Sequence, residues 1–354
     1  MAAALHALAV GIRPRSGVTA FSTFYKHIPS KPFGRTQAAF HPSTALKLNR
    51  FLFDPSEVVV ADDGSEVPTV TLSKDDYRTV HAAKILGLQN GDCLRAGVVA
   101  EDVGADTAGN ADAYAGCVTD QATIEWLPEG KIKKACPTKN GDPPGSLRIA
   151  LESLAPFTES SDNPQGDTSS TSDSVSLILA LPRPLQLGRM LPMISQMGVD
   201  HLVLTAAKKV PKDYFGSHLF RKPQVLRKLL IEGLCQSGDV KIPKITVVKR
   251  LKRFTEDDLD ALFPADEYAR VIAHPQRVGQ TEAPNRMREV TFPESKRQRK
   301  VVIAVGPEGG WEEPYELDMF QSLGFQQITM GTRVLRSDVA VVSLLSLAHD
   351  VCSE

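Results

Sequence analysis

The C-terminal half of the chain alternates short apolar runs with longer stretches whose apolar residues recur at helical spacing. The apolar runs are SLILALP (176–182), VDHLVLTAA (199–207), KITVVKRL (244–251), ARVIAHP (269–275) and VVIAVG (301–306). The helical stretches are 183–198, 222–238, 315–324 and 338–352. Fully apolar strands that alternate with helices predict an α/β domain with a parallel sheet covered on both faces. In such sheets ligands bind beyond the carboxyl ends of the strands, so the loops after 273 and 305 form the candidate site.

The N-terminal half has a different pattern, in which short stretches typical of strands follow one another closely. They lie in NRFLFDPSEVVV (49–60), PTVTL (68–72), AYAGCVTD (113–120), ATIEWL (122–127) and SLRIALESLAP (146–156). A helix is expected to start at Ser73, before a turn at Asn90 and Gly91. Short strands at this spacing predict a small β-barrel domain over residues 49–157.

Two segments have compositions that do not favour a packed fold. Residues 158–174 are rich in Ser, Thr, Asp and Gly, which predicts a flexible insert before the α/β domain at 175–354. Residues 1–50 contain seven Lys or Arg and no Asp or Glu. An acid-free leader with Arg and Ser, over 1–48, is typical of a mitochondrial or plastid transit peptide, and the alternative is a basic tail on a cytoplasmic protein.

The charge is distributed unevenly along the chain, although the formal net charge is only −1. Residues 175–300 contain 23 Lys or Arg against 13 Asp or Glu, whereas residues 301–354 contain two Arg against eight acids. This local excess of positive charge favours a polyanion such as RNA as partner. No apolar run is long enough for a membrane span, and the five cysteines form no C-x-x-C pair, so neither a membrane nor a metal is expected.

The loop at 306–310, GPEGG, is the most unusual part of the candidate site. It lacks the spacing of a dinucleotide-binding loop and the Lys-Ser/Thr ending of a phosphate-binding loop. Glycine leaves the backbone accessible, because no Cβ blocks a flat ligand. From this pattern alone, a tight turn with a solvated Glu308 explains the loop equally well.

Two C-terminal motifs resemble those of a known family. VGPEGGW (305–311) and MGTRVLRSDVA (330–340) are similar to I-G-P-E-G-G-[FW] and L-G-x-R-[IV]-L-R-x-E-T-A of the 16S rRNA (uracil-N3)-methyltransferase family of the SPOUT superfamily. LPRP (181–184) resembles the branch of that family with L-P-R-P at this place, and NRFLFDP (49–55) resembles its PUA-like N-terminal barrel. The resemblance implies a SPOUT parallel sheet with a deep trefoil knot, preceded by a PUA-like RNA-binding domain.

The resemblance also implies a cleft for S-adenosylmethionine (SAM) and a reaction. The implied cofactor-binding residues are His274, Pro275, Gly306, Pro307, Glu308, Gly309, Gly310, Met330, Gly331, Arg333, Leu335, Arg336, Ser337 and Ala340. The implied reaction is methylation of N3 of a uridine in small-subunit rRNA, with Arg336 and Asp338 as catalytic residues and no metal. For Arg333 and Arg336 the alternative role is an ion pair with Asp338 or Glu308. For Asp338 the alternative role is a cap on the helix that follows.

The chain departs from the family pattern at two positions that affect this interpretation. Asp338 stands where the family usually has Glu, and Asp239 where many members have Arg. Two further functions are therefore considered: a SPOUT enzyme that methylates tRNA, and a catalytically weak protein that binds rRNA as an assembly factor. Members of the superfamily usually pair, and the apolar run at 339–352 fits this, so a homodimer is expected.

Overall fold

The structure, a computed structural model, describes residues 49–60, 67–100, 113–129, 136–137, 141–157, 174–294 and 298–353. The predicted leader at 1–48 and nearly all of the predicted insert at 158–174 lie outside the described residues. The bounds of the four segments given above stay predictions.

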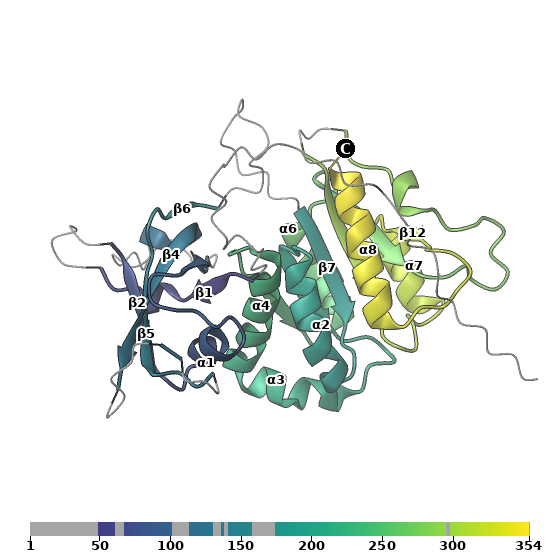
Figure 1. The fold of residues 1–354 in the computed structure, drawn as a ribbon. Coiled ribbons are helices and arrows are strands. Elements are labelled where there is room, and N and C mark those ends of the chain that lie inside the picture. Colours follow the sequence, from purple (N-terminus) through teal and green to yellow (C-terminus); the bar gives the residue numbers. More distant parts are fainter. Residues whose placement is uncertain are drawn as a thin grey trace, which may run out of the picture. The chain divides into compact units, whose positions relative to one another are not determined.

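The C-terminal domain is built on a sheet of six parallel strands in the order β12-β10-β11-β7-β8-β9 (Figure 1). The strands are β7 (Ser174–Ala180), β8 (His201–Thr205), β9 (Lys244–Val248), β10 (Tyr268–Ala273), β11 (Lys300–Val305) and β12 (Gln326–Ile328). Every residue of β8 is buried, as is β11 from Val301 onward. Strands buried on both faces need helices on both sides of the sheet, as the sequence pattern predicts.

Helices cover the two faces of this sheet. Figure 1 shows α2, α4 and α8 together over one face, and α8 contacts β7 and β11. On the opposite face α5 and α7 meet, where the Thr255 hydroxyl contacts the Met319 sulfur at 3.5 Å. The helices are α2 (Pro184–Gln196), α3 (His218–Arg221), α4 (Pro223–Ser237), α5 (Leu251–Asp257), α6 (Leu259–Leu262), α7 (Tyr315–Ser322) and α8 (Ser337–Cys352), with the 3-10 helices η3 (Lys212–Gly216) and η4 (Met287–Glu289).

The connection between β10 and β11 runs along the outer side of β12. The Asn285 N–H donates to the Gln327 carbonyl at 3.1 Å, and the Thr329 N–H donates to the Asn285 carbonyl at 2.9 Å. The same connection contacts α8 through η4. The chain leaves β12 between β10 and this connection and then reaches α8 over β7 and β11, which is the path expected of the knotted SPOUT fold.

The N-terminal domain contains a curled, mainly antiparallel sheet in the order β1-β3-β4-β5-β2, with β6 paired to β4. Its elements are β1 (Phe51–Phe53), η1 (Pro55–Glu57), β2 (Thr69–Leu72), α1 (Tyr77–Lys84), β3 (Cys93–Val98), β4 (Cys117–Pro128), β5 (Gly145–Ala150) and β6 (Ala155–Pro156). Among the described residues β1 and β2 are the two ends of this path, so the predicted barrel is a partly open one.

Two sequence expectations in this domain need correction. The separate strands expected at 113–120 and 122–127 form one strand, β4, because the pairing with β3 shifts register at Asp120 and Gln121, as in a β-bulge, and then continues. The helix expected to start at Ser73 starts at Tyr77, because the Asp76 side chain accepts the Arg78 N–H at 2.8 Å and so caps the helix there.

Candidate active site

Three of the candidate loops leave the same edge of the parallel sheet. Ala273, the last residue of β10, pairs with Val305 of β11 on one side and with Ile328 of β12 on the other. The segments after these strands, at 274–275, 306–310 and 329–336, therefore start next to one another. The structure brings together the three parts of the cleft that the resemblance implies.

The glycine loop, defined here as residues 306–310, is a tight turn followed by a glycine in the left-handed region. The Gly310 N–H donates to the Pro307 carbonyl at 2.8 Å, and Gly310 has φ +69°. Glu308 and Gly309 occupy the middle of the turn. A residue with a Cβ is strained at such a φ, which explains the glycine at 310.

The strand end at His274 faces this loop. The His274 Nδ1–H donates to the Pro275 carbonyl at 2.8 Å, since a carbonyl can only accept, and the Nε2 atom lies 3.6 Å from a Glu313 carboxylate oxygen. A Cβ at Gly310 would lie 4.0 Å from His274 Nε2. Below them, the buried Gln327 side chain donates to the Pro275 carbonyl at 2.8 Å and so holds the strand end in place.

The glycine loop is anchored at its C-terminal end by an aromatic cluster. Trp311 is 1% exposed and packs on Phe320 of α7, with ring centroids 4.9 Å apart. Phe320 in turn packs edge-on against Phe325 at 4.8 Å. Such pairs add about 0.5–1.5 kcal/mol to the burial itself, so the end of the loop is rigidly fixed on α7.

The two predicted catalytic residues pair with each other. Arg336 Nε donates to Asp338 Oδ1 at 2.7 Å, and Arg336 Nη2 donates to Asp338 Oδ2. This pairing with Arg336, together with the Val339 N–H, lowers the pKa of Asp338 to about 2. Arg336 is 70% exposed on its side chain and Asp338 only 11%. The guanidinium therefore lies at the surface of the site, with Asp338 beneath it.

The alternative roles considered for these residues are resolved in part. The ion pair Arg336–Asp338 is present, whereas Glu308 pairs instead with Arg183 of the LPRP motif at 3.1 Å. Asp338 does not cap α8 from outside, because the N-cap position is Arg336 and Asp338 lies in the first turn. The Ser337 hydroxyl is buried and has no hydrogen-bond partner among the described residues.

Two residues hold the glycine loop and the chain just after it, at 311–312, and sequence reasoning predicted neither contact. Lys209 Nζ donates to the carbonyls of Gly309 at 2.9 Å and Trp311 at 3.1 Å. Glu316, 3% exposed, accepts the Lys208 and Glu312 N–H groups at 2.7 Å each. A charged residue on the buried side of an amphipathic helix is the signal that could have identified Glu316.

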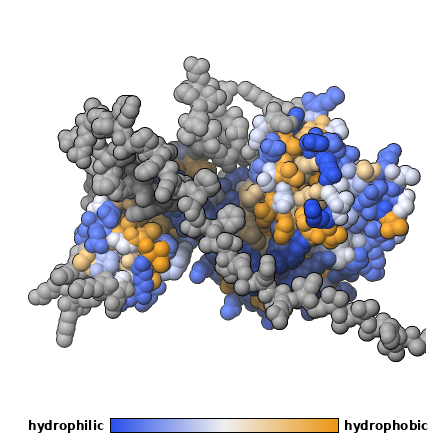
Figure 2. All heavy atoms as spheres, turned by 45° about the vertical axis from the view of Figure 1, so that its right-hand side comes forward, coloured by the Kyte–Doolittle hydropathy of each residue, from blue (hydrophilic) through white to orange (hydrophobic). Residues whose placement is uncertain are grey.

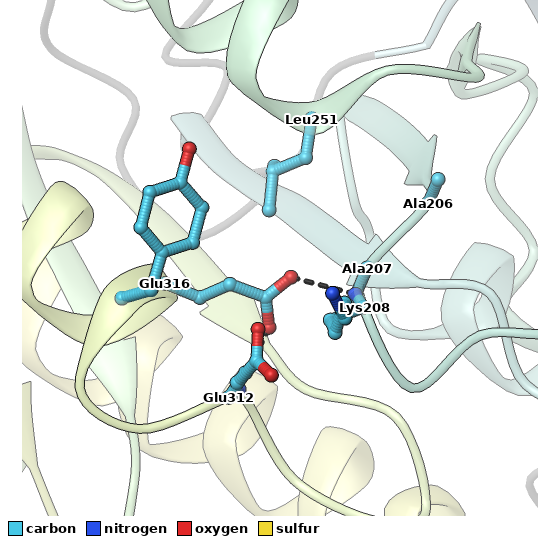
Figure 3. Close-up of a pocket in the computed structure, with 7 residues that line it drawn as sticks. Ala206, Ala207, Lys208, Leu251, Glu312 and Glu316 are labelled. Atoms are coloured by element: carbon cyan, nitrogen blue, oxygen red, sulfur yellow. Dashed lines mark hydrogen bonds between the residues drawn. The ribbon is translucent and has the colours of Figure 1, made fainter.

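A cavity of about 370 Å³ lies next to the glycine loop, between the ends of β8, α5 and α7 (Figure 3). The Glu316 carboxylate reaches across it to the backbone of Lys208. Its lining residues are Ala206, Ala207, Lys208, Leu251, Glu312, Tyr315 and Glu316.

Exposed cations follow the neighbouring strands at the same edge of the sheet. Lys208 and Lys209 come after β8, and Lys249 and Arg250 after β9, whose last residues Thr205 and Val248 are paired. A further basic group, KRQRK (296–300), is described only from Gln298 onward. There Arg299 donates to the Val351 carbonyl and Lys300 pairs with Glu267, so both have structural contacts.

Within the described ranges, no group of three or more His, Cys, Asp or Glu side chains is placed to hold a metal ion. None of the described helices is long and apolar enough to cross a membrane.

Comparison with known families gives a match that covers just over half of the chain. The family described as an RNA methyltransferase domain matches residues 169–349, which are 181 of the 354 residues. The chain belongs to this family. The matched region contains all three cleft loops, and so the RNA methyltransferase domain includes every candidate site residue.

Individual relatives agree with this assignment. The chain is 28% identical over 177 residues to ribosomal RNA small subunit methyltransferase E of Treponema pallidum, with 49% of this chain and 62% of the relative covered. It is 44% identical over 48 residues to the protein of the same name from Mesomycoplasma hyopneumoniae, covering 14% of this chain and 21% of the relative. The chain thus spans less than two thirds of the length of these curated relatives.

A solved structure supports the fold of the whole described chain. Ribosomal RNA small subunit methyltransferase E from Neisseria gonorrhoeae, bound to S-adenosyl methionine, has a TM-score of 0.53 with 16% identity. The similarity covers 86% of this chain and 97% of that one, and so extends over both domains. The predicted fold class, a knotted SPOUT domain preceded by a PUA-like domain, is confirmed.

Proposed function

We propose that the protein transfers the methyl group of SAM to N3 of a uridine in small-subunit rRNA. The observation that carries this proposal is the meeting of three loops at the ends of β10, β11 and β12, in a chain of the RNA methyltransferase family. The relatives are named as small-subunit rRNA methyltransferases, and these names support small-subunit rRNA as the target.

The residues at the cleft fit SAM. Gly310 at φ +69° and Gly331 at φ +129° present backbone without a Cβ, which an adenine ring or a methionine chain can approach closely. The Ser337 hydroxyl, buried and without a partner in the described chain, is available to a ligand. His274 lies at the edge of the glycine loop, with its Nε2 atom 3.6 Å from a Glu313 carboxylate oxygen. The residues that would hold SAM are those named from the family resemblance.

Bound SAM would supply an electrophilic methyl group, and the chain's own residues would prepare the uridine. N3 carries a proton in the resting base, so negative charge on the uracil ring must be stabilised as that proton leaves. We assign this role to Arg336, whose exposed guanidinium is a fixed planar donor. The catalytic role of Asp338 stays a prediction, and its pKa of about 2 favours orienting Arg336 over accepting a proton near neutral pH.

RNA would reach this edge through Lys208, Lys249 and Arg250, three exposed cations that follow β8 and β9. Lys249 and Arg250 come directly after the last residue of β9, and Lys208 comes three residues after the end of β8. Phosphate contacts of this kind make the affinity fall as salt rises, by about one power of the salt concentration for each contact. A homodimer that completes the cleft also remains part of this proposal.

The weak-enzyme alternative stays open. Asp239 accepts the N–H groups of Val240 and Lys241 and so closes the turn after α4, which gives the aspartate a structural role but does not replace an arginine at this position. A tRNA target has no observation in its favour, and the experiment below includes it as a substrate.

The test uses the full chain with SAM labelled in the methyl group. Small-subunit rRNA, tRNA and large-subunit rRNA are offered separately, and SAM binding is measured by calorimetry. We expect label only in small-subunit rRNA. We expect Arg336→Ala to bind SAM nearly normally and to lose transfer by about two to three orders of magnitude, the usual cost of removing one such donor. SAM binding without transfer to any RNA would support an assembly factor, and label in tRNA alone would refute the proposed target.

A further inference from the structure

The loop between β8 and η3 is tied at two points to the glycine loop and to residues 311–312, which follow it directly. Lys209 provides the first, because its ammonium donates to the carbonyls of both Gly309 and Trp311. Glu316 of α7 provides the second, because one carboxylate oxygen accepts the Lys208 N–H and the other the Glu312 N–H. We propose that Lys209 and Glu316 are positioning residues that hold the glycine loop in the shape that binds SAM. This inference rests on the proposed function only for the identity of the ligand.

The bonds to Lys209 are specific for one shape of the loop. Two carbonyls two residues apart, Gly309 and Trp311, point at one ammonium, and between them Gly310 has φ +69°. Carbonyls that converge in this way repel each other unless a cation lies between them. Hydrogen bonds from a charged donor are stronger than those between neutral groups. Without the ammonium, the carbonyls would favour turning apart, and the amides of the turn would move with them.

Glu316 holds the loop after β8 and the chain just after the glycine loop at a fixed separation. Its side chain is buried; one oxygen accepts the Lys208 N–H (Figure 3) and the other accepts the Glu312 N–H. A buried carboxylate is stable in this setting because its hydrogen bonds replace the lost water. Glu316 thereby sets the distance between the loops, across which the Lys209 side chain then reaches.

The Lys209 side chain runs close to Gly309. A Cβ at Gly309 would stand 3.2 Å from Lys209 Cδ, so the lysine side chain would have to shift by a few tenths of an ångström to admit it. Gly309 does not have a positive φ, so backbone strain does not explain the glycine at this position.

The apparent affinity of a loop for its ligand falls in proportion to the fraction of time that the loop spends in its binding shape. If the loop is correct about one tenth of the time without Lys209, the dissociation constant for SAM rises about tenfold. The maximal rate should change little, because Lys209 does not touch the reacting atoms in this proposal.

The test compares Lys209→Met, which keeps the aliphatic chain, with Lys209→Arg, which keeps the charge. Lys212→Met is the matched control, since Lys212 is an exposed lysine three residues further along. SAM affinity is measured by calorimetry and the KM values for SAM and RNA are determined separately. We expect Lys209→Met to raise the dissociation constant and the KM for SAM about tenfold, Lys209→Arg to recover most of the loss, and Lys212→Met to match the wild type.

Amide hydrogen exchange in the ligand-free full chain provides a readout that needs neither SAM nor RNA. In Lys209→Met the amides of 309–312 should exchange faster, while those of α8 stay as in the wild type. If the wild type fails to bind SAM, the proposed function fails, and the exchange experiment still tests the role of Lys209. Unchanged exchange and unchanged SAM affinity in a folded Lys209→Met protein would overturn the inference. A rise in the KM for RNA alone would also overturn it, because Lys209 would then be an RNA contact.

Glu316→Gln tests the second point. An amide side chain offers one oxygen where the carboxylate offers two, so one of the two backbone N–H groups is left without an acceptor. Faster exchange at both Lys208 and Glu312, with a lower melting temperature, is expected. Protection at these two amides equal to that of the wild type would show that Glu316 does not hold the loops together.

Discussion

Gly310 is the residue whose backbone conformation most limits substitution in the candidate cleft. Its φ of +69° is unfavourable for any residue with a Cβ, and most of all for one branched at Cβ. We expect Gly310→Val to weaken SAM binding by roughly tenfold or more, since left-handed backbone costs such residues on the order of 1–3 kcal/mol. Calorimetry measures the change.

Gly324→Val is the control for this substitution. Gly324 has φ +82° and open space around it, but it precedes β12 and so lies away from the cleft loops. The two variants should lose similar stability, and only the one at 310 should lose SAM affinity. Equal affinity in both would mean that the glycine loop is not part of the cofactor cleft.

Asp338 gives a prediction about pH. Its carboxyl has a pKa of about 2 in the folded chain, against 3.8 for the unperturbed group, because Arg336 stabilises the charged form. The stabilising contribution is therefore complete above pH 4 and is lost as the pH falls toward 2. Denaturant unfolding at several pH values should show a difference between wild type and Asp338→Asn that is constant from pH 7 to 5 and shrinks below pH 4.

The same pKa bears on catalysis. The methylation rate between pH 6 and 9 should show no step that belongs to Asp338. If the stability difference between wild type and Asp338→Asn disappears already between pH 7 and 5, the pKa of Asp338 is not lowered and a role as proton acceptor becomes the better interpretation.

At the scale of single elements, α8 has one face in the core and another that remains partly apolar. Leu344, Leu345 and Ala348 are buried against the sheet, whereas Val339 and Leu347 are 47% and 41% exposed. Figure 2 shows apolar side chains gathered on the side of the C-terminal domain that it displays. An apolar helix face of this kind suits contact with a second copy of the chain.

We expect a homodimer that this face of α8 helps to form. Leu347→Glu should shift the mass measured by light scattering from dimer to monomer, because a buried charge without a partner is costly at an interface. Ile85→Glu is a control, since Ile85 is 71% exposed but belongs to the N-terminal domain. A wild type that is monomeric at micromolar concentration and fully active would refute the dimer.

The longer elements of the C-terminal domain were predictable from sequence because their patterns are long and largely apolar, whereas the short elements β12, α3, α5 and α6 were not predicted. The strands in SLILALP and VVIAVG become β7 and β11, and DVAVVSLLSLAHDVC becomes α8. The join of two expected strands into β4 was not predictable, since Asp120 and Gln121 interrupt the apolar pattern within a continuous strand. The contacts of Lys209 and Glu316 join loops 100 residues or more apart, and no local pattern reports such pairs.

At the scale of the whole molecule, the basic leader is a separate question from catalysis. Residues 1–48 resemble no part of the family's fold and are not among the described residues. We propose that they direct the protein to the mitochondrion or the plastid. Deleting them should leave methyl transfer in vitro intact and should release a fluorescent fusion into the cytoplasm. A truncated fusion that stays in its organelle would rule out a transit peptide.

The site as a whole was identified from two sequence motifs, and the structure adds the order of the strands that brings these motifs together. The sequence places residues 305–311 and 330–340 far from His274, and only the order β12-β10-β11 brings the three together. The excess of positive charge over 175–300 was visible in the sequence. Which cations lie at the cleft depends on the pairing of β8 with β9, which puts Lys208 and Arg250 at the same edge of the sheet.

The most direct measurement is mass spectrometry of nucleosides from small-subunit rRNA that has been incubated with SAM and the purified full chain. The rRNA is taken from cells that lack the protein, so that its target nucleotide is unmodified. We expect 3-methyluridine to appear at one position with the wild type, and at a level roughly two to three orders of magnitude lower in the same time with folded Arg336→Ala. If the wild type binds this RNA and SAM but produces no 3-methyluridine, or methylates a different base, the protein is not a uridine-N3 methyltransferase.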